Sequence, residues 1–306
     1  MHMSWVQTHV FLGTEMTDYL VLFNRWALLA FVLCTMTGVG LLLQLGQIFQ
    51  VLRERRQLGL TLLANFVVLP SLAWWVCRRL DLDVSIQAAI LLATTAPGCP
   101  TLLRLNAAAR GDQALAVSQY VLLSVLTVAF QPLVLPWVLQ GVEVSSIDIV
   151  RSLGLTVLVP LVLGLSVRAR WPIFAERARR VIDKVGSLSA LLVLILFPVL
   201  YFDAMLNVLR QGALTALLLY MPLALGVGWL FGSASTPSYR RVLTLCCGQG
   251  NMGIAFVSAA ANFKDPTVGI TLIVMLFLTL LPLVPMALFF GRSAAMADRV
   301  TEAVQR

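Results

Sequence analysis

The sequence predicts an all-α polytopic membrane protein, and three observations support this fold class. Hydrophobic residues make up 59% of the 306-residue chain and charged residues only 12%, whereas a typical soluble domain carries about 25% charged residues. The apolar residues fall into segments that are long enough to cross a bilayer as helices. Two of these segments are interrupted by glycine, proline and amide residues, which is typical of the discontinuous helices of secondary transporters.

Nine apolar segments have the length of a transmembrane helix, and no stretch between them is long enough for a separate soluble domain. We therefore expect residues 1–306 to form one integral membrane transporter unit. Residues Met1–Tyr19 are too polar to span and lack the pattern of a cleaved signal peptide. The predicted segments are about Leu20–Leu45, Leu60–Cys77, Ile86–Ala109, Gln113–Leu139, Ile147–Val167, Val185–Leu206, Ala213–Phe231, Val242–Asn262 and Val268–Phe290.

The third and eighth segments contain the two interruptions. The first reads Thr94-Thr95-Ala96-Pro97-Gly98-Cys99-Pro100, and the second reads Cys246-Cys247-Gly248-Gln249-Gly250-Asn251-Met252-Gly253. A helix in lipid must satisfy its own backbone, whereas proline removes a donor and glycine loosens the turn. Paired breaks of this kind indicate the binding site of a secondary transporter. The alternative is a pair of kinked helices that bind nothing.

The two breaks occupy corresponding places in two halves of the chain, because a long segment with two prolines follows each of them. An odd number of spans between the breaks gives the halves opposite orientations in the membrane. This arrangement predicts an inverted repeat, with two broken helices that cross near the midplane. We expect the first repeat at about residues 20–139, without its opening helix, and the second at about residues 147–290.

The net charge of +8 is explained by membrane topology rather than by nucleic-acid binding. The loops form two alternating sets, of which one holds 16 Lys and Arg residues and the other holds 6. The positive-inside rule places the richer set, which includes Arg168–Lys184, in the cytoplasm. The sequence thus predicts a protein of the plasma membrane (the inner membrane of a cell), with its N-terminus outside and its C-terminus cytoplasmic.

The sequence shows no pattern of an enzyme, a cofactor site or a metal site. The five cysteines lie in or at the ends of apolar segments without CxxC spacing, and both histidines, His2 and His9, lie in the N-terminal tail. No acid–base set or phosphate-binding loop falls within the apolar segments. We expect no cofactor other than sodium, and membrane lipid and a small-molecule substrate as partners. The oligomeric state stays open.

Four motifs, taken in order and with their spacing, resemble the bile acid:sodium symporter family. The run Asn65-Phe66-Val67-Val68-Leu69-Pro70 resembles its third helix, and Pro97-Gly98-Cys99 resembles the Pro-Gly-Gly of its first break. Ala109-Arg110-Gly111-Asp112 is similar to the Ala-Arg-Gly-Asn that closes the first broken helix. Gly248 through Gly253, with Asn251, resembles the Gly-x-Gln-Asn-x-Gly of the second break. The match runs from about Val39 to Leu139 and resumes around the second break.

The resemblance implies a fold and a substrate class. The family fold is a ten-helix inverted repeat with a core domain and a panel domain, interleaved in sequence, and members that lack the first helix have nine. The resemblance also implies sodium symport of amphipathic organic anions, such as sterol conjugates or small carboxylates, by alternating access.

At the sodium-ligand positions the chain departs from the family. The family's Gln on the third helix is replaced by Asn65, and the substrate-facing Asn is kept as Asn251. The family's Ser-Asn, two hydroxyls, acidic residue and Gln fall here on Leu102 and Leu103, Ala116 and Tyr120, Cys246, and Gly250. Sodium prefers several hard oxygen ligands, so the sequence predicts weak or absent sodium dependence.

The breaks and the resemblance together identify the candidate site residues. Those predicted to bind substrate are Pro97, Gly98, Cys99, Pro100, Arg104, Gly248, Gln249, Gly250, Asn251 and Asn65. Those predicted to bind an ion are Asn65, Gln119, Cys246 and Gln249.

Arg104 lies one turn into the second half of the first broken helix, beside the lost sodium ligands. Its guanidinium is expected either to replace a sodium ion electrostatically or to bind a substrate carboxylate. The alternative for Arg104 is a side chain that extends to the cytoplasmic face.

Two other functions stay open. Cys99 and Cys246, one at each break, are candidate soft ligands for export of a metalloid oxyanion. The eroded sodium positions are also compatible with a membrane sensor that keeps the fold without transporting.

Overall fold

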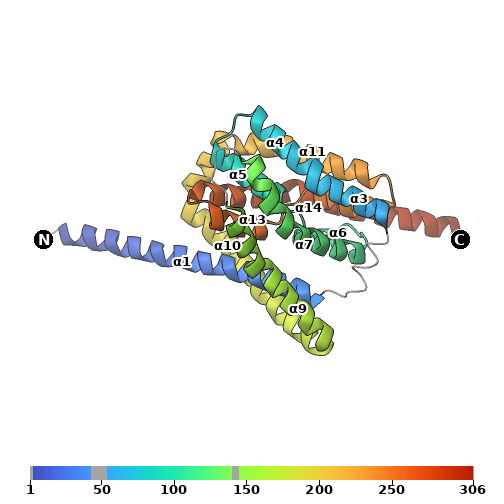
Figure 1. The fold of residues 1–306 in the computed structure, drawn as a ribbon, viewed down its shortest axis with the longest axis horizontal. Coiled ribbons are helices and arrows are strands. Elements are labelled where there is room, and N and C mark those ends of the chain that lie inside the picture. The colour runs from blue at the N-terminus through green and yellow to red at the C-terminus, as the bar shows by residue number, and fades with distance from the viewer. Residues whose placement is uncertain (1–2, 43–53, 140–144, 306) are drawn as a thin grey trace.

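The computed structural model describes residues 3–42, 54–139 and 145–305, and these residues form helices without a β-strand (Figure 1). In chain order the helices are α1 (Met3–Leu42), α3 (Arg55–Leu63), α4 (Leu69–Arg79), α5 (Val84–Thr94), α6 (Thr101–Ala108), α7 (Gln113–Val138), α8 (Ser146–Leu153), α9 (Val159–Arg170), α10 (Pro172–Val208), α11 (Leu214–Gly232), α12 (Pro237–Cys247), α13 (Met252–Asn262) and α14 (Pro266–Gln305). Three π-helical turns join neighbouring helices: η1 (Ala64–Val68), η2 (Gly154–Leu158) and η3 (Leu209–Ala213).

Within the described residues, six helical stretches are long and apolar enough to cross a membrane. One of them has 61 residues, or about 90 Å of helix, which is three times the hydrocarbon thickness of a bilayer. The chain leaves helical geometry within this stretch at Gly212, where φ is 101°. The six stretches are Tyr19–Leu42, Arg55–Arg79, Gln113–Val138, Ser146–Arg170, Pro172–Gly232 and Pro266–Met296.

Both predicted interruptions are confirmed. Helix α5 ends at Thr94 and α6 begins at Thr101, while α12 ends at Cys247 and α13 begins at Met252. Helices α5 and α13 have 11 residues each, so each extends about 16 Å, or half the thickness of a bilayer core.

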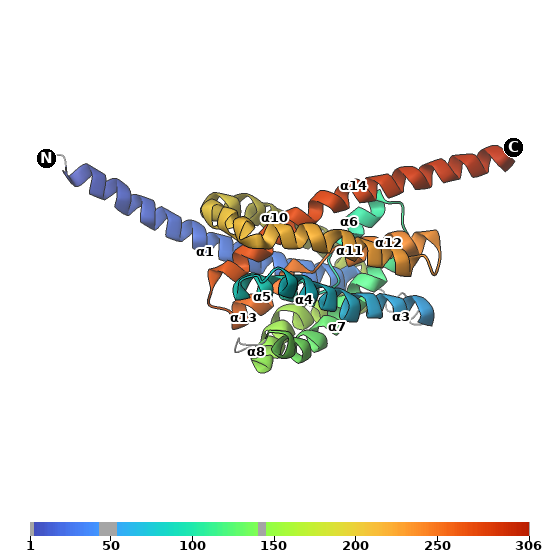
Figure 2. The ribbon, with the colours of Figure 1, turned by 90° about the horizontal axis from the view of Figure 1, so that it is seen from above.

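Helices α1, α10 and α14 extend well beyond the predicted apolar segments. Helix α1 begins at Met3, α10 begins at Pro172 rather than near Val185, and α14 continues to Gln305. Apolar segments report the part of a helix that lipid can cover, whereas a helix continues into water while its backbone hydrogen bonds are made. The N-terminal part of α1 and the C-terminal part of α14 project at opposite ends of the molecule (Figures 1 and 2). The predicted segment end at Leu45 and the basic residue Arg53 lie outside the described residues.

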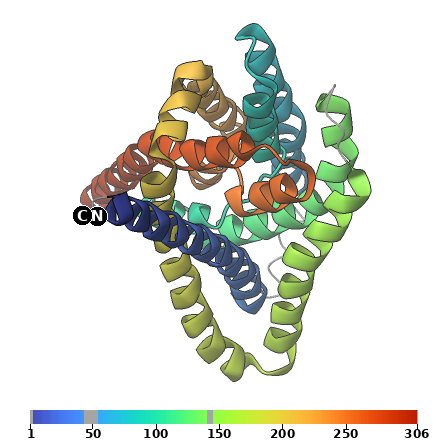
Figure 3. The same ribbon diagram turned by 90° about the vertical axis from the view of Figure 1, so that its left-hand side faces the viewer.

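Helix α1 lies between the arms of the α9–α10 hairpin (Figure 3). Small residues permit this packing, because a Cβ on Gly164 would approach the carbonyl oxygen of Thr37 to 2.5 Å and the Cα of Gly40 to 3.0 Å. Such close backbone approach is typical of helix pairs in membranes. Helices α1 and α10 form one side of the larger cavity described below.

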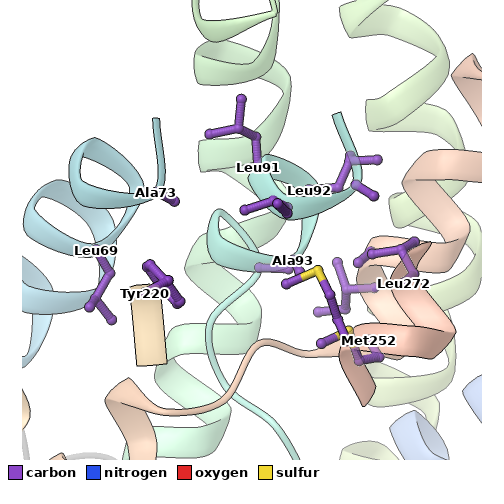
Figure 4. Packing of buried hydrophobic residues seen from close by; sticks show 14 of the residues in the cluster. Leu69, Ala73, Leu91, Leu92, Ala93, Tyr220, Met252 and Leu272 are labelled. Atoms are coloured by element: carbon purple, nitrogen blue, oxygen red, sulfur yellow. The ribbon is translucent and has the colours of Figure 1, made fainter. Parts of the chain in front are cut away.

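Helix α5 lies at the centre of the remaining helices. All but three of its residues are buried, as expected for a helix that is apolar on every face. Figure 4 shows Ala93 of α5 near Met252 of α13, with Leu69 of α4 and Tyr220 of α11 close by. The core therefore holds the end of α5, where the first break begins, against the start of α13, where the second break ends.

The π-helical turn η1 precedes Pro70, and this turn contains Asn65. Proline has no N–H group, so Pro70 cannot donate to the carbonyl of Phe66, four residues earlier. A local widening of the helix follows, and such π-turns are frequent at functional sites. Asn65 is fully buried at this turn.

Candidate functional site

The two breaks lie directly against each other. Pro97 and Gly250 form an isolated antiparallel bridge, and the backbone N–H of Asn251 donates to the carbonyl oxygen of Ala96 at 2.6 Å. Backbone hydrogen-bonding groups that one break leaves without a helical partner are thus paired with those of the other break. Lipid offers no hydrogen-bond partners, so backbone polar groups at membrane depth must pair within the protein, as they do here.

Asn251 connects the two breaks through its side chain. Its Oδ1 accepts from the backbone N–H of Ile254 at 3.2 Å and caps the N-terminus of α13. Its Nδ2 donates to the carbonyl oxygen of Gly98 at 2.6 Å. An amide offers a donor and an acceptor together, whereas an aspartate would only accept. Asn251 therefore holds the first break and the second helix start in one geometry.

Two glycines make the close approach possible. Gly98 has φ of 89°, a conformation that costs glycine little, and a Cβ there would lie 2.8 Å from the carbonyl oxygen of Tyr120. A Cβ on Gly250 would overlap the carbonyl oxygen of Ala93. Neither position has room for a side chain.

Helix α7 supplies donors to the carbonyls that the first break exposes. Ser124 Oγ donates to the carbonyl of Gly98 at 3.1 Å, and Thr127 Oγ1 donates to that of Pro97 at 3.3 Å. Gln131 Nε2 donates to the carbonyl of Leu92 at 3.0 Å and accepts at its Oε1 from Ser258 Oγ of α13 at 2.6 Å. The polar residues of α7 thus stabilise both broken helices from one side.

A cavity of about 520 Å³ lies where the breaks face α1 and α10. The starts of α6 and α13 border it through Cys99, Pro100, Thr101 and Asn251. Helix N-termini carry partial positive charge. Most of the remaining lining is apolar, and it includes Leu28, Phe31, Leu194, Phe256, Ile273 and Leu280.

The polar end of this larger cavity carries charged side chains. Arg104 Nη2 donates to Ser187 Oγ of α10 at 3.0 Å, and Arg179 Nε lies 3.2 Å from Asp183 Oδ2. The side chains of Arg179 and Asp183 are 39% and 48% exposed. Arg104 is exposed as well, so this end of the cavity is hydrated.

A second cavity, of about 20 Å³, lies on the other side of the breaks. This volume holds about one water-sized particle. The lining residues with a side-chain oxygen are Asn65, Thr94, Tyr220, Gln249 and Thr279. The Oε1 atom of Gln249 is buried and has no hydrogen-bond partner among the described residues.

A buried chain of hydrogen bonds leads away from this smaller cavity. Cys246 Sγ donates weakly to Asn65 Oδ1 at 3.9 Å, and Asn65 Nδ2 donates to the carbonyl of Thr61 at 2.9 Å. Gln119 Nε2 donates to Thr61 Oγ1 at 3.1 Å. Tyr239 contacts the same hydroxyl at 3.1 Å.

The predicted site residues therefore separate into two groups. Cys99, Pro100, Arg104 and Asn251 line the larger cavity, whereas Asn65, Pro97, Gly248, Gln249 and Gly250 line the smaller one. Gly98 meets Asn251 through its carbonyl, and Cys246 and Gln119 belong to the buried hydrogen-bond chain.

Sequence reasoning missed the contribution of α10 to the larger cavity. Arg179, Asp183 and Ser187 line it, but Arg179 and Asp183 fall in the stretch that the apolar segments assign to a cytoplasmic loop. Their spacing in the sequence could have indicated that they lie together, since residues at i, i+4 and i+8 share one face of a helix.

Comparison with known proteins supports one family. A model of the sodium bile acid symporter family matches residues 28–211, which is more than half of the chain. A rice (Oryza sativa subsp. japonica) protein described as a probable sodium/metabolite cotransporter BASS2, chloroplastic, is 23% identical over 239 residues, covering 77% of this chain and 57% of the relative. An uncharacterized sodium-dependent transporter YocS of Bacillus subtilis (strain 168) is 23% identical over 239 residues, covering 75% of this chain and 72% of the relative. The chain thus spans less than two thirds of the rice relative.

These matches agree with the apolar helices and with the paired breaks of α5–α6 and α12–α13. The chain is an integral membrane protein, and it belongs to the sodium bile acid symporter family.

Proposed function

We propose that this protein is a secondary active transporter that moves a small or amphipathic organic anion by alternating access. The observation that carries the proposal is the larger cavity, which is bordered by both breaks and has one charged and one apolar end. Arginine binds carboxylates and sulfonates through charge-assisted hydrogen bonds, and the apolar wall suits a hydrocarbon body. The starts of α6 and α13 add positive partial charge near the same space.

The helices form two groups that could move relative to each other during transport. Helices α1, α9 and α10 pack together on one side of the larger cavity, and both breaks lie on the other. A relative movement of these groups would expose the cavity to either side of the membrane. We count nine spans by treating each broken helix as one span and α10 and α11 as two, and we place the halves as inverted repeats.

Uptake into proteoliposomes tests the proposal. Purified protein should accumulate labelled sterol conjugates or small carboxylates above protein-free vesicles. Ala190 lines the larger cavity on α10, and Ala190→Trp should block this uptake by filling the space. Binding without uptake would support the sensor alternative. Thiol-dependent arsenite efflux would support metalloid export, although only Cys99 of the predicted thiol pair lines the larger cavity.

We propose that any coupling sodium ion binds in the smaller cavity. Both relatives carry sodium in their descriptions, and sodium takes hard oxygen ligands. Leu102, Ala116 and Tyr120, at the family's ligand positions, are fully buried. The smaller cavity instead offers Gln249 Oε1 and the neutral side-chain oxygens of four other lining residues. We expect weak binding, because the described lining residues include no carboxylate to offset the charge.

Replacing sodium with potassium should therefore lower uptake by no more than about threefold, or about 0.7 kcal/mol. Gln249→Met keeps the length of the side chain, removes the buried oxygen and should abolish the remaining difference. Uptake measured across a sodium titration for both proteins gives the result. A saturable sodium requirement above tenfold that persists in Gln249→Met would contradict the assignment.

Cysteine labelling should place the α9–α10 turn in the cytoplasm. Trp171 lies in this turn and is 59% exposed, so Trp171→Cys should react with an impermeant maleimide only in inverted vesicles. Lys264→Cys, between α13 and α14, should react only in intact cells. Four of the five native thiols are buried, which keeps the background low. The opposite pattern would reverse the topology.

A further inference from the structure

The larger cavity contains a carboxylate, which an anion site by itself does not explain. Among the described residues that line it, three side chains are charged: Arg104 of α6, and Arg179 and Asp183 of α10. A carboxylate in such a cavity repels the proposed cargo. Its presence therefore calls for a role beyond attraction of the anion.

The structure holds Asp183 in place from two sides. Its Oδ2 pairs with Arg179 Nε at 3.2 Å, one helical turn earlier. Its Oδ1 lies against α1, because a Cβ on Gly38 would be only 2.7 Å from that oxygen. Ser187, one turn further along α10, accepts the hydrogen bond from Arg104. Asp183 thus pairs with the Arg179 guanidinium itself and lies one turn before Ser187, which holds the Arg104 guanidinium.

Two guanidinium groups and one carboxylate leave the lining with one net positive charge. A monoanion would balance this charge. Among the described lining residues, the second carboxylate of a dianion would find no further cation, and Asp183 would repel it. This arrangement uses repulsion to reject the wrong ligand, a common device of specific sites.

We propose that Asp183 sets the charge selectivity of the larger cavity, so that monoanions bind and dianions are rejected. This inference rests on the proposed anion-transport function. The exposure of Arg179 and Asp183 means that solvent screens the interaction, so we expect a selectivity of about tenfold rather than of several orders of magnitude.

Two matched ligand pairs test the inference: octanoate with octanedioate, and 2-naphthoate with naphthalene-2,6-dicarboxylate. Affinities are measured by thermal shift of the full-length protein in detergent at pH 7.5. Wild-type protein should bind each monoanion about tenfold more tightly than its dianion. Asp183→Asn should reduce this ratio to about one. Glu176→Gln removes one carboxylate from an exposed position of α10 that does not line the cavity, and it should leave the ratio unchanged.

A double variant separates charge selection from a structural role. The double variant Asp183→Asn, Arg179→Gln removes the ion pair. Arg104 then remains as the charged residue among the described lining residues, and the net charge of the lining is again +1. This variant should regain the preference for monoanions, whereas damage to the fold would be worse in the double variant than in the single one. High salt should weaken the wild-type preference, because the screening length falls from about 10 Å at 0.1 M to about 3 Å at 1 M.

An unchanged ratio in Asp183→Asn, with monoanion binding intact, would overturn the inference and leave the proposed function standing. An Asp183→Asn, Arg179→Gln protein that binds dianions as well as Asp183→Asn does would overturn it too. Failure of wild-type protein to bind either monoanion, while Ala190→Trp gives the same thermal profile, would count against the proposed function itself.

Discussion

Gly250→Ala is expected to abolish transport and to lower stability by about 3 kcal/mol. The added methyl group would overlap the carbonyl oxygen of Ala93 at the end of α5. The backbone would have to separate there, which would also break the bridge to Pro97 and the hydrogen bond from Asn251 to Ala96. The loss therefore combines overpacking with unsatisfied backbone groups in an apolar environment. Thermal unfolding in detergent and proteoliposome uptake measure the two effects.

Gly226→Ala is the matched control for this change. Gly226 lies within α11, and a Cβ there would meet nothing within 4 Å. Alanine is favoured over glycine in a helix by about 1 kcal/mol, so this variant should be as stable as wild type or slightly more stable. A Gly250→Ala protein with wild-type unfolding temperature and uptake would show that the two breaks can separate without consequence.

Arg104→Gln is expected to weaken anion affinity by about ten- to a hundredfold. The side chain lines the larger cavity, and its Nη2 reaches across to Ser187 of α10. A hydrogen bond to a charged partner contributes about 1.5–3 kcal/mol, which corresponds to this range of affinity. Arg104→Lys should recover part of the loss, because the charge remains while the bidentate geometry is lost. Competition of labelled-anion binding measures the three affinities.

Arg180→Gln controls for the loss of a positive charge. Arg180 is exposed on α10 and does not line either cavity, so its replacement should leave affinity unchanged. A shift below twofold in correctly inserted Arg104→Gln protein would show that Arg104 only extends to the cytoplasmic surface. Asn251 would then be the better-supported contact for the anion.

The breaks were predictable because local chemistry determines them. Pro97 and Pro100 lack N–H donors, and Gly98 lies between them, so a regular helix is disfavoured there. The same reasoning applies to Gly248 and Gly250 in the second break. Their paired occurrence and the Asn65, Asn251 and Ala109–Asp112 motifs were also sufficient to identify the family, which the match over residues 28–211 confirms.

The charged end of the larger cavity was not predictable from apolar segments. Arg179 and Asp183 belong to a basic stretch that topology rules assign to a loop, yet they continue α10 as a helix and face Arg104 across the cavity. Arg104 comes from the first half of the chain and α10 from the second. Nothing local in either segment specifies that they meet.

The sequence by itself determined the helical membrane fold, the position of both breaks and the residues that compose them. These properties follow from hydrophobic length and from the backbone chemistry of proline and glycine, which act within a few residues. Only the tertiary structure decided that Pro97 meets Gly250, that Asn251 bonds to Gly98, and that the candidate residues divide between two cavities. Contacts between residues about 150 positions apart, such as Asn251 and Gly98, depend on how all the helices pack together, because each pair approaches only as closely as its neighbours allow.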